Sequence, residues 1–122
     1  MESSRLTLLG VPIDSVGRSG GTEDGPAGLR RQLGGNGLRD AGDTSQHIRG
    51  SDRSVKNGWL AYDDIVKMTG EVRGRVGEIT AAGEVPLVIG GCCTLVPAVL
   101  AGARDTYGDI GLAYFDGHLD LF

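Results

Sequence analysis

Residues 110–120 read IGLAYFDGHLD, an apolar run that leads directly into an Asp-x-His-x-Asp motif. The apolar residues predict a buried strand from Ile110 to Phe115. If the backbone stays extended through the motif, side chains two positions apart point the same way. Asp116, His118 and Asp120 would then converge on one volume, where two carboxylates and an imidazole suit Mn²⁺, Fe²⁺, Co²⁺ or Zn²⁺. The stretch predicts a metal site at the mouth of a sheet.

Two other apolar runs have the same form. Residues 5–13 (RLTLLGVPI) predict a strand of about six residues that ends at Pro12, and a glycine-rich loop follows at residues 14–25. Residues 85–89 (VPLVI) predict another strand, which leads into residues 90–94 (GGCCT). Functional sites of parallel sheets lie beyond the carboxyl ends of the strands. Three segments that are far apart in the sequence are therefore expected at one edge of a sheet.

Helical patterns alternate with these strands. Pro26 is suited to the first turn of a helix that runs to Leu33. Apolar residues recur at three- and four-residue steps between residues 61 and 82, and a further helix is expected from Thr94, as its N-cap, to about Tyr107. The apolar stripe of the second helix consists of Ile65, Met68, Val72, Val76 and Ile79.

The order of these elements predicts the fold class. Residues 36–58 contain few apolar residues, and at most a short strand is expected at residues 46–49. The predicted strands are continuous apolar runs, which is typical of strands buried on both faces. We therefore expect an α/β protein with a parallel sheet, right-handed crossovers and helices on both faces.

The length and net charge of the chain exclude some classes of function. A chain of 122 residues forms at most one domain. A net charge of -4, with dispersed basic residues, argues against nucleic acid or a phospholipid surface as partner. The sequence contains no apolar run of membrane-spanning length and no signal peptide, so a cytoplasmic location is expected. The two cysteines are neighbours and cannot form a disulfide framework.

Each motif also has a plainer interpretation. The three polar residues after Phe115 could form a solvated loop. Cys92 and Cys93 could fill space at a helix start, or a thiolate could be stabilised by the helix N-terminus, which we favour for Cys93. The glycine-rich loop lacks the spacing of a phosphate or dinucleotide site. His47 lies in a polar segment and is expected at the surface.

Four ordered motifs resemble the ureohydrolases, the family of arginase, agmatinase and formimidoylglutamase. Residues 9–14 (LGVPID) and 25–30 (GPAGLR) resemble the opening strand, loop and helix start of that family. Residues 86–91 (PLVIGG) resemble the strand before its Gly-Gly-Asp-His-Ser motif, and residues 115–120 (FDGHLD) match its Asp-Ala-His-x-Asp motif. The resemblance implies an arginase-like three-layer α/β/α fold, of which residues 1–122 would be the N-terminal part of a single domain.

The resemblance also implies an activity. Ureohydrolases cleave C–N bonds of guanidino or amidine small molecules with a hydroxide that two Mn²⁺ ions activate. By this resemblance Asp116 would bridge both ions, Asp120 would bind one and His118 the other. Such a protein would be expected to form homo-oligomers.

Two departures modify this expectation. Cys93 occupies the position of a metal-binding histidine of the family, and a thiolate favours Zn²⁺ or Fe²⁺ over Mn²⁺. The family's later Asp-x-Asp segment, which supplies further ligands, is absent. We therefore expect a truncated chain that binds at most one ion and has little or no activity alone. The alternative is a non-catalytic metal-binding or subunit-interaction protein on the same scaffold; a redox role for the two cysteines is less favoured because adjacent cysteines close a strained ring.

Overall fold

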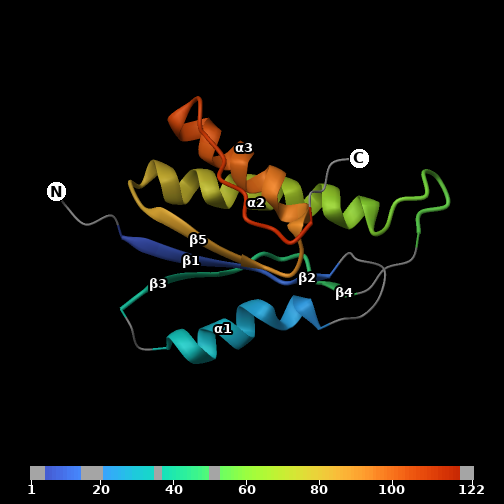
Figure 1. Ribbon diagram of the computed structural model, residues 1–122, viewed down its shortest axis with the longest axis horizontal. Coiled ribbons are helices and arrows are strands. Elements are labelled where there is room, and N and C mark those ends of the chain that lie inside the picture. Colours follow the sequence, from blue (N-terminus) through green and yellow to red (C-terminus); the bar gives the residue numbers. More distant parts are fainter. Residues whose placement is uncertain (1–4, 15–20, 35–36, 50–52, 119–122) are drawn as a thin grey trace.

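A three-stranded parallel sheet forms the centre of the computed structural model (Figure 1). Its strands are β3 (Arg39–Asp43), β1 (Leu6–Val11) and β5 (Val85–Gly90), in that spatial order. Beyond the end of β1, β2 (Ile13–Asp14) pairs with β4 (Ile48–Arg49), also in parallel. The structure describes residues 5–14, 21–34, 37–49 and 53–118.

Helices cover both faces of this sheet, as Figure 1 shows. The helix α1 (Gly25–Leu33) lies on one face, and α2 (Tyr62–Ala81) and α3 (Val96–Tyr107) lie together on the other. Short 3-10 turns, η1 (Thr22–Asp24) and η2 (Cys93–Leu95), precede α1 and α3. The predicted α/β fold with a parallel sheet and helices on both faces is confirmed.

The core lies between β1 and the helix pair. Leu9 and Val11 of β1 are fully buried, as are Met68, Val72 and Val76 of α2. These α2 residues belong to the predicted apolar stripe, whose other members Ile79 and Ile65 are buried and partly buried. Packing of one helix face against the strand therefore stabilises α2 despite its glycines.

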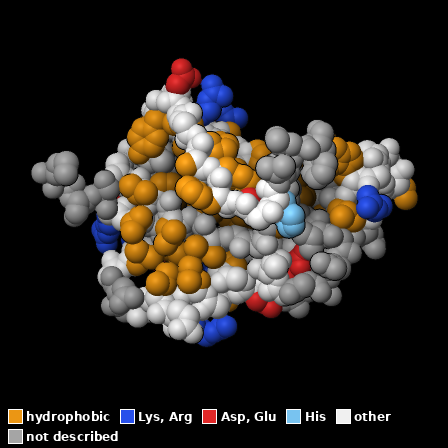
Figure 2. All heavy atoms as spheres, viewed as in Figure 1, with side chains coloured by type: hydrophobic (Ala, Val, Ile, Leu, Met, Phe, Trp, Pro, Cys, Tyr) orange, Lys and Arg blue, Asp and Glu red, His pale blue; other side chains and the backbone are white. Residues whose placement is uncertain are grey.

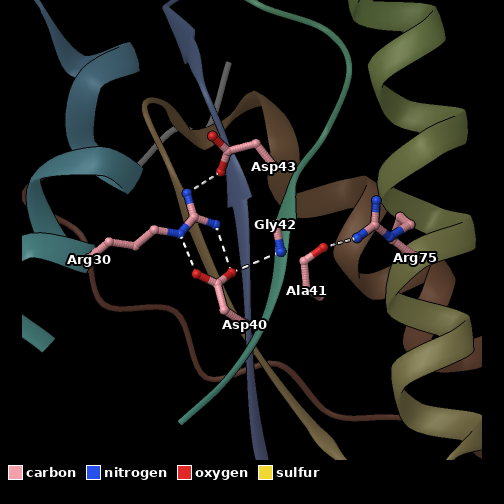
Figure 3. Close-up of polar contacts among 6 residues, drawn as sticks. All are labelled: Arg30, Asp40, Ala41, Gly42, Asp43 and Arg75. Carbon is pink, nitrogen blue, oxygen red and sulfur yellow. Dashed lines mark hydrogen bonds and ion pairs between the residues drawn. The ribbon is translucent and has the colours of Figure 1, made fainter. Parts of the chain in front are cut away.

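The sequence prediction missed β3 because this strand has little apolar character. Its sequence RDAGD has three charged residues, and its side chains are half-buried or exposed. Side-chain hydrogen bonds from both faces of the sheet hold it instead. Arg75 of α2 donates to the Ala41 carbonyl oxygen from one side, and Arg30 of α1 binds from the other (Figure 3).

Arg30 makes a forked contact with two carboxylates of β3. Its Nε lies 2.7 Å from Asp40 Oδ2 and its Nη2 lies 3.0 Å from Asp40 Oδ1, while its Nη1 pairs with Asp43. The backbone N–H of Gly42 also donates to Asp40 Oδ1, at 2.8 Å. Gly10 of β1 has no side chain, and a Cβ there would overlap the Asp43 carboxylate. Arg30 thus ties α1 to the edge of the sheet.

The predicted strand from Ile110 to Phe115 is wrong. This segment has no strand conformation, and among the described residues β5 pairs only with β1. Leu112, Tyr114 and Phe115 are exposed, and the exposed fraction of Phe115 reaches 95%. With neither a ladder of hydrogen bonds nor a covering layer, the strand propensity of the segment is not sufficient to make it a strand.

We expect the Arg30 contact to make the free energy of unfolding depend on pH. The hydrogen bond from Arg30 is the main cause that lowers the pKa of Asp40 below its ordinary 3.8, so its contribution is present above that value and is lost as pH falls through the lowered pKa. Because the Asp40 side chain is 46% exposed, solvent screens the pair, and Arg30→Gln should cost about 1 kcal/mol at pH 7. Urea unfolding at pH 7 and pH 3 should show the difference from wild type shrinking in acid. Arg31→Gln removes the same charge from an exposed position of α1 and should have little effect; an equal loss would contradict the assignment.

The crossing of α2 and α3 should be sensitive to one glycine. A Cβ at Gly102 would lie 2.6 Å from the Arg73 carbonyl oxygen and 2.8 Å from Val76 Cβ. Gly102→Ala should therefore destabilise the protein by about 1–3 kcal/mol in thermal or urea unfolding. Gly74→Ala in α2 is the matched control, since nothing lies within 4 Å, and it should stabilise by up to about 1 kcal/mol.

Candidate functional site

The ends of β1 and β5 meet at one edge of the sheet. Val11 pairs with Gly90 at the end of the ladder, and β2 continues the chain beyond β1. A Cβ at Gly91 would overlap the Ile13 carbonyl oxygen and would lie 3.0 Å from the Thr22 carbonyl carbon. The ends of the predicted strands at residues 5–13 and 85–89 are therefore in contact, as we expected from the sequence.

Two carboxylates at this edge are buried. Asp14 is fully buried at the end of β2, and Glu23 is 8% exposed in η1. Placing an ionisable group away from water is costly, and such groups concentrate at functional sites. Sequence reasoning assigned both to a loop; the signal for Asp14 was its position directly after the apolar residues Val11 to Ile13.

The two cysteines lie where β5 leads into α3. Neither forms a disulfide in the described part of the chain; Cys93 is exposed and Cys92 is half-buried. The Cys92 Sγ lies 3.2 Å from Thr94 Oγ1. The prediction that Thr94 caps α3 is wrong, because the N-cap of α3 is Leu95 and no side chain makes a capping hydrogen bond there. A 3-10 turn moves the start of the helix past Thr94.

The Asp-x-His motif forms a local turn instead of an extended segment. Asp116 Oδ1 accepts a hydrogen bond from the backbone N–H of His118 at 2.9 Å, and Oδ2 accepts one from the Tyr114 hydroxyl at 3.1 Å. The side chain of His118 is 88% exposed, and its Nδ1 lies 3.7 Å from Asp116 Oδ1. The expected common direction of these side chains required an extended backbone, and the turn replaces it. Asp120 lies outside the described residues.

These hydrogen bonds hold Asp116 in its ionised form. The backbone N–H of His118 is the main cause that lowers the pKa of Asp116, and the Tyr114 hydroxyl contributes next. Both donors interact more favourably with the charged carboxylate. Local groups of this chain therefore satisfy the negative charge.

The chemistry of Asp116, His118 and Cys93 suits a divalent cation, but these described side chains are not placed as one ligand group. Asp120, the fourth predicted ligand, is not among the residues that the structure describes. Across residues 5–14, 21–34, 37–49 and 53–118, no group of three His, Cys, Asp or Glu side chains is placed to hold a metal ion. Both oxygens of Asp116 accept hydrogen bonds from neighbouring residues. These hydrogen bonds fix the orientation of the carboxylate, and each oxygen keeps a further lone pair.

The match to one protein family covers nearly the whole chain. The model of the arginase family matches residues 4–122. The chain is 25% identical over 127 residues to an arginase of Brevibacillus brevis, with 98% of this chain and 42% of that protein covered. It is 27% identical over 136 residues to human arginase-1, with 98% of this chain and 39% of that protein covered. The chain thus spans about two fifths of the length of these relatives.

Solved structures show the same fold. A crystal structure of arginase from Bacillus subtilis superimposes with a TM-score of 0.80 at 22% identity, covering 98% of this chain and 42% of that one. A putative agmatinase from Clostridium difficile gives a TM-score of 0.67 at 20% identity, over 96% of this chain and 43% of that one.

None of the helices in the described part of the chain has the length and apolar character of a membrane span.

The contact between the two strand ends should depend on Gly91. Any side chain there meets backbone atoms of Ile13 in β2 and of Thr22 in η1, and backbone atoms cannot move aside as the end of a flexible side chain can. Gly91→Ala should cost about 1–3 kcal/mol of unfolding free energy and shift the amide NMR signals of Ile13 and Thr22. Gly111→Ala is the control, because a Cβ there meets nothing within 4 Å. Unchanged stability of the Gly91 variant would show that the strand ends are not in contact.

Proposed function

Because the chain belongs to the arginase family, we propose that it carries part of a metal-dependent amidinohydrolase that cleaves C–N bonds in guanidino or amidine small molecules. The observation that carries this proposal is the family match over residues 4–122, together with the packing of two family motifs at one edge of the sheet. Buried Asp14 and Glu23 beside those motifs support a polar site at this edge. We further propose a cytoplasmic homo-oligomer, with residues 1–122 forming the N-terminal part of one domain.

For the metal we propose Asp116, His118 and Asp120 as ligands, with Cys93 in the place of a family histidine. The support is their chemistry: carboxylates and imidazole accept Mn²⁺, and a thiolate would shift the preference toward Zn²⁺ or Fe²⁺. Two carboxylates and one thiolate carry less negative charge than two dications carry positive charge, and the set has fewer ligands than a binuclear site needs. We therefore propose weak binding of a single ion and little or no turnover by these 122 residues alone.

A non-catalytic role in metal binding or subunit interaction is the second candidate. It is favoured by the exposed apolar side chains of Leu112, Tyr114 and Phe115, which follow α3 without a covering layer. Hydrophobic side chains also gather on the face of the molecule that Figure 2 shows, and apolar surface of this kind is typical of surfaces that another polypeptide covers. In this role the scaffold would present a surface, and the ligands missing from a complete site would come from a partner.

We expect this chain to bind a metal ion weakly without catalysing measurable hydrolysis. We expect Mn²⁺ titration by calorimetry to show at most one weakly bound ion, and urea release from arginine or agmatine to stay at background with Mn²⁺ added. Asp116→Asn should weaken Mn²⁺ binding, because an amide is a poorer ligand than a carboxylate for a hard cation. Asp109→Asn removes an acid outside the motif and should leave binding unchanged. Robust urea release by the 122-residue chain would contradict the proposed inactivity.

Native mass spectrometry with metal analysis distinguishes the two candidates. An assembly that holds a stoichiometric ion and releases no urea would support the interaction role. A monomer that binds no metal, even at high Mn²⁺, would contradict both.

A further inference from the structure

A cavity of about 420 Å³ lies beside the carboxyl end of β5. One wall is a short hairpin whose ends are joined by an antiparallel bridge between Arg53 and Leu60. The opposite wall comes from the first turns of α2 and from Thr94, just after β5. We call it the Trp59 cavity; its lining residues are Arg53, Asn57, Gly58, Trp59, Leu60, Ile65 and Thr94.

Backbone hydrogen bonds shape the hairpin. The N–H of Ser54 donates to the Trp59 carbonyl oxygen at 2.7 Å, and the N–H of Gly58 donates to the Ser54 carbonyl oxygen at 2.8 Å. The N–H of Trp59 donates to Asn57 Oδ1 at 3.0 Å. The hairpin therefore holds the backbone of Trp59 in a defined position before any ligand arrives, which lowers the entropic cost of binding.

The entry into α2 completes the apolar wall. Ala61 has a φ of 45°, a left-handed conformation that is uncommon for a residue other than glycine. This turn lets Leu60 and Ile65 line the same cavity, and Ile65 N–H donates to the Ala61 carbonyl oxygen at 2.9 Å. The Tyr62 ring meets Trp59 edge to face, with centroids 6.3 Å apart and an angle of 65°. Because the two rings are not stacked face to face and Trp59 is 66% exposed, the indole keeps surface that a flat ligand can contact.

The charge of the cavity favours an anion. Arg53 Nη1 donates to the Gly58 carbonyl oxygen at 2.9 Å, and Arg53 forms no ion pair with any residue that the structure describes. A guanidinium has five N–H groups, so several remain for a ligand. Asn57 uses its oxygen toward Trp59, which leaves its NH₂ group as a further donor.

Other cavities in the described part of the chain differ in charge. Four of them each include at least one acidic residue: Asp40, Asp63 and Asp64, Asp40 and Glu78, or Asp105 and Asp109. Among the described residues, the lining of the Trp59 cavity includes a guanidinium and no carboxylate. Arg53 also lines the neighbouring cavity that contains Asp63 and Asp64, but it pairs with neither.

We propose that the Trp59 cavity binds a small organic monocarboxylate with a flat apolar body. The guanidinium fork of Arg53 matches a carboxylate, while the indole of Trp59 and the side chains of Leu60 and Ile65 accept the body. A single cation suits one negative charge better than a phosphate dianion. None of the described lining residues belongs to the Asp-x-His-x-Asp motif, and the proposal does not rest on the proposed hydrolase function.

Three ligands of one shape test the proposal: benzoate, neutral benzamide and cationic benzamidine. Trp59 is the sole tryptophan, so the single indole N–H signal in a nitrogen–proton NMR spectrum reports on this cavity without any metal. Benzoate should shift that signal saturably. Benzamide and benzamidine should bind at least about tenfold more weakly than benzoate, because they lose the charge-assisted hydrogen bonds. Equal binding of benzamide or benzamidine, or no saturable shift with benzoate, would overturn the proposal.

Substitutions in the hairpin test whether benzoate binds in the Trp59 cavity. Arg53→Gln should weaken benzoate binding about tenfold or more, whereas Lys56→Gln, which removes one positive charge from the same hairpin outside this cavity, should leave it unchanged. Arg53→Lys keeps the charge and a donor to Gly58 but loses the fork. It should bind benzoate more weakly than wild type and still prefer it to benzamide; loss of that preference with an intact indole signal would refute the role of Arg53.

Discussion

The burial of β1 on both faces is the constraint on which the rest of this structure depends. Its backbone is paired on both sides, by β3 and by β5, and the adjacent residues Leu8 and Leu9, which point to opposite faces, are both buried. A strand in this position needs a helical layer above and below it. The chain supplies both layers by its order: it moves from β1 to β3 through α1, then crosses back over β1 to β5 through α2. Right-handed crossovers in opposite directions place these helices on opposite faces.

The same reversal of direction positions the candidate site. Where successive connections leave a parallel sheet to opposite sides, the strand ends diverge and a crevice opens beyond them. In this protein Gly91 packs against the backbone of Ile13, which brings the end of β5 close to β2 and to buried Asp14. The Trp59 cavity lies beside the same end of β5, through Thr94. Polar chemistry at this edge is thus a consequence of the winding of the chain.

The Asp-x-His motif shows what a strand end requires in order to present ligands. Its carboxylate can point outward only if the preceding segment is extended and paired. Here the segment before it is unpaired, and Asp116 accepts hydrogen bonds from His118 and Tyr114 instead. Among the described residues, the outer edge of β5 has no partner strand, and Leu112 and Phe115 are exposed. In the part of the chain that the structure describes, membership of the arginase family therefore coexists with a local turn at Asp116 and His118.

The sequence alone determined the features that depend on local pattern. Apolar runs identified β1 and β5, the three- and four-residue period identified α2, and four ordered motifs identified the family. Tertiary contacts decided the rest. The strand β3 exists because Arg30 and Arg75 hold a polar segment against β1, a contact between residues distant in the sequence. Strand propensity at Ile110–Phe115 was not enough without a paired neighbour, because the ladder and the burial that stabilise a strand come from other parts of the molecule.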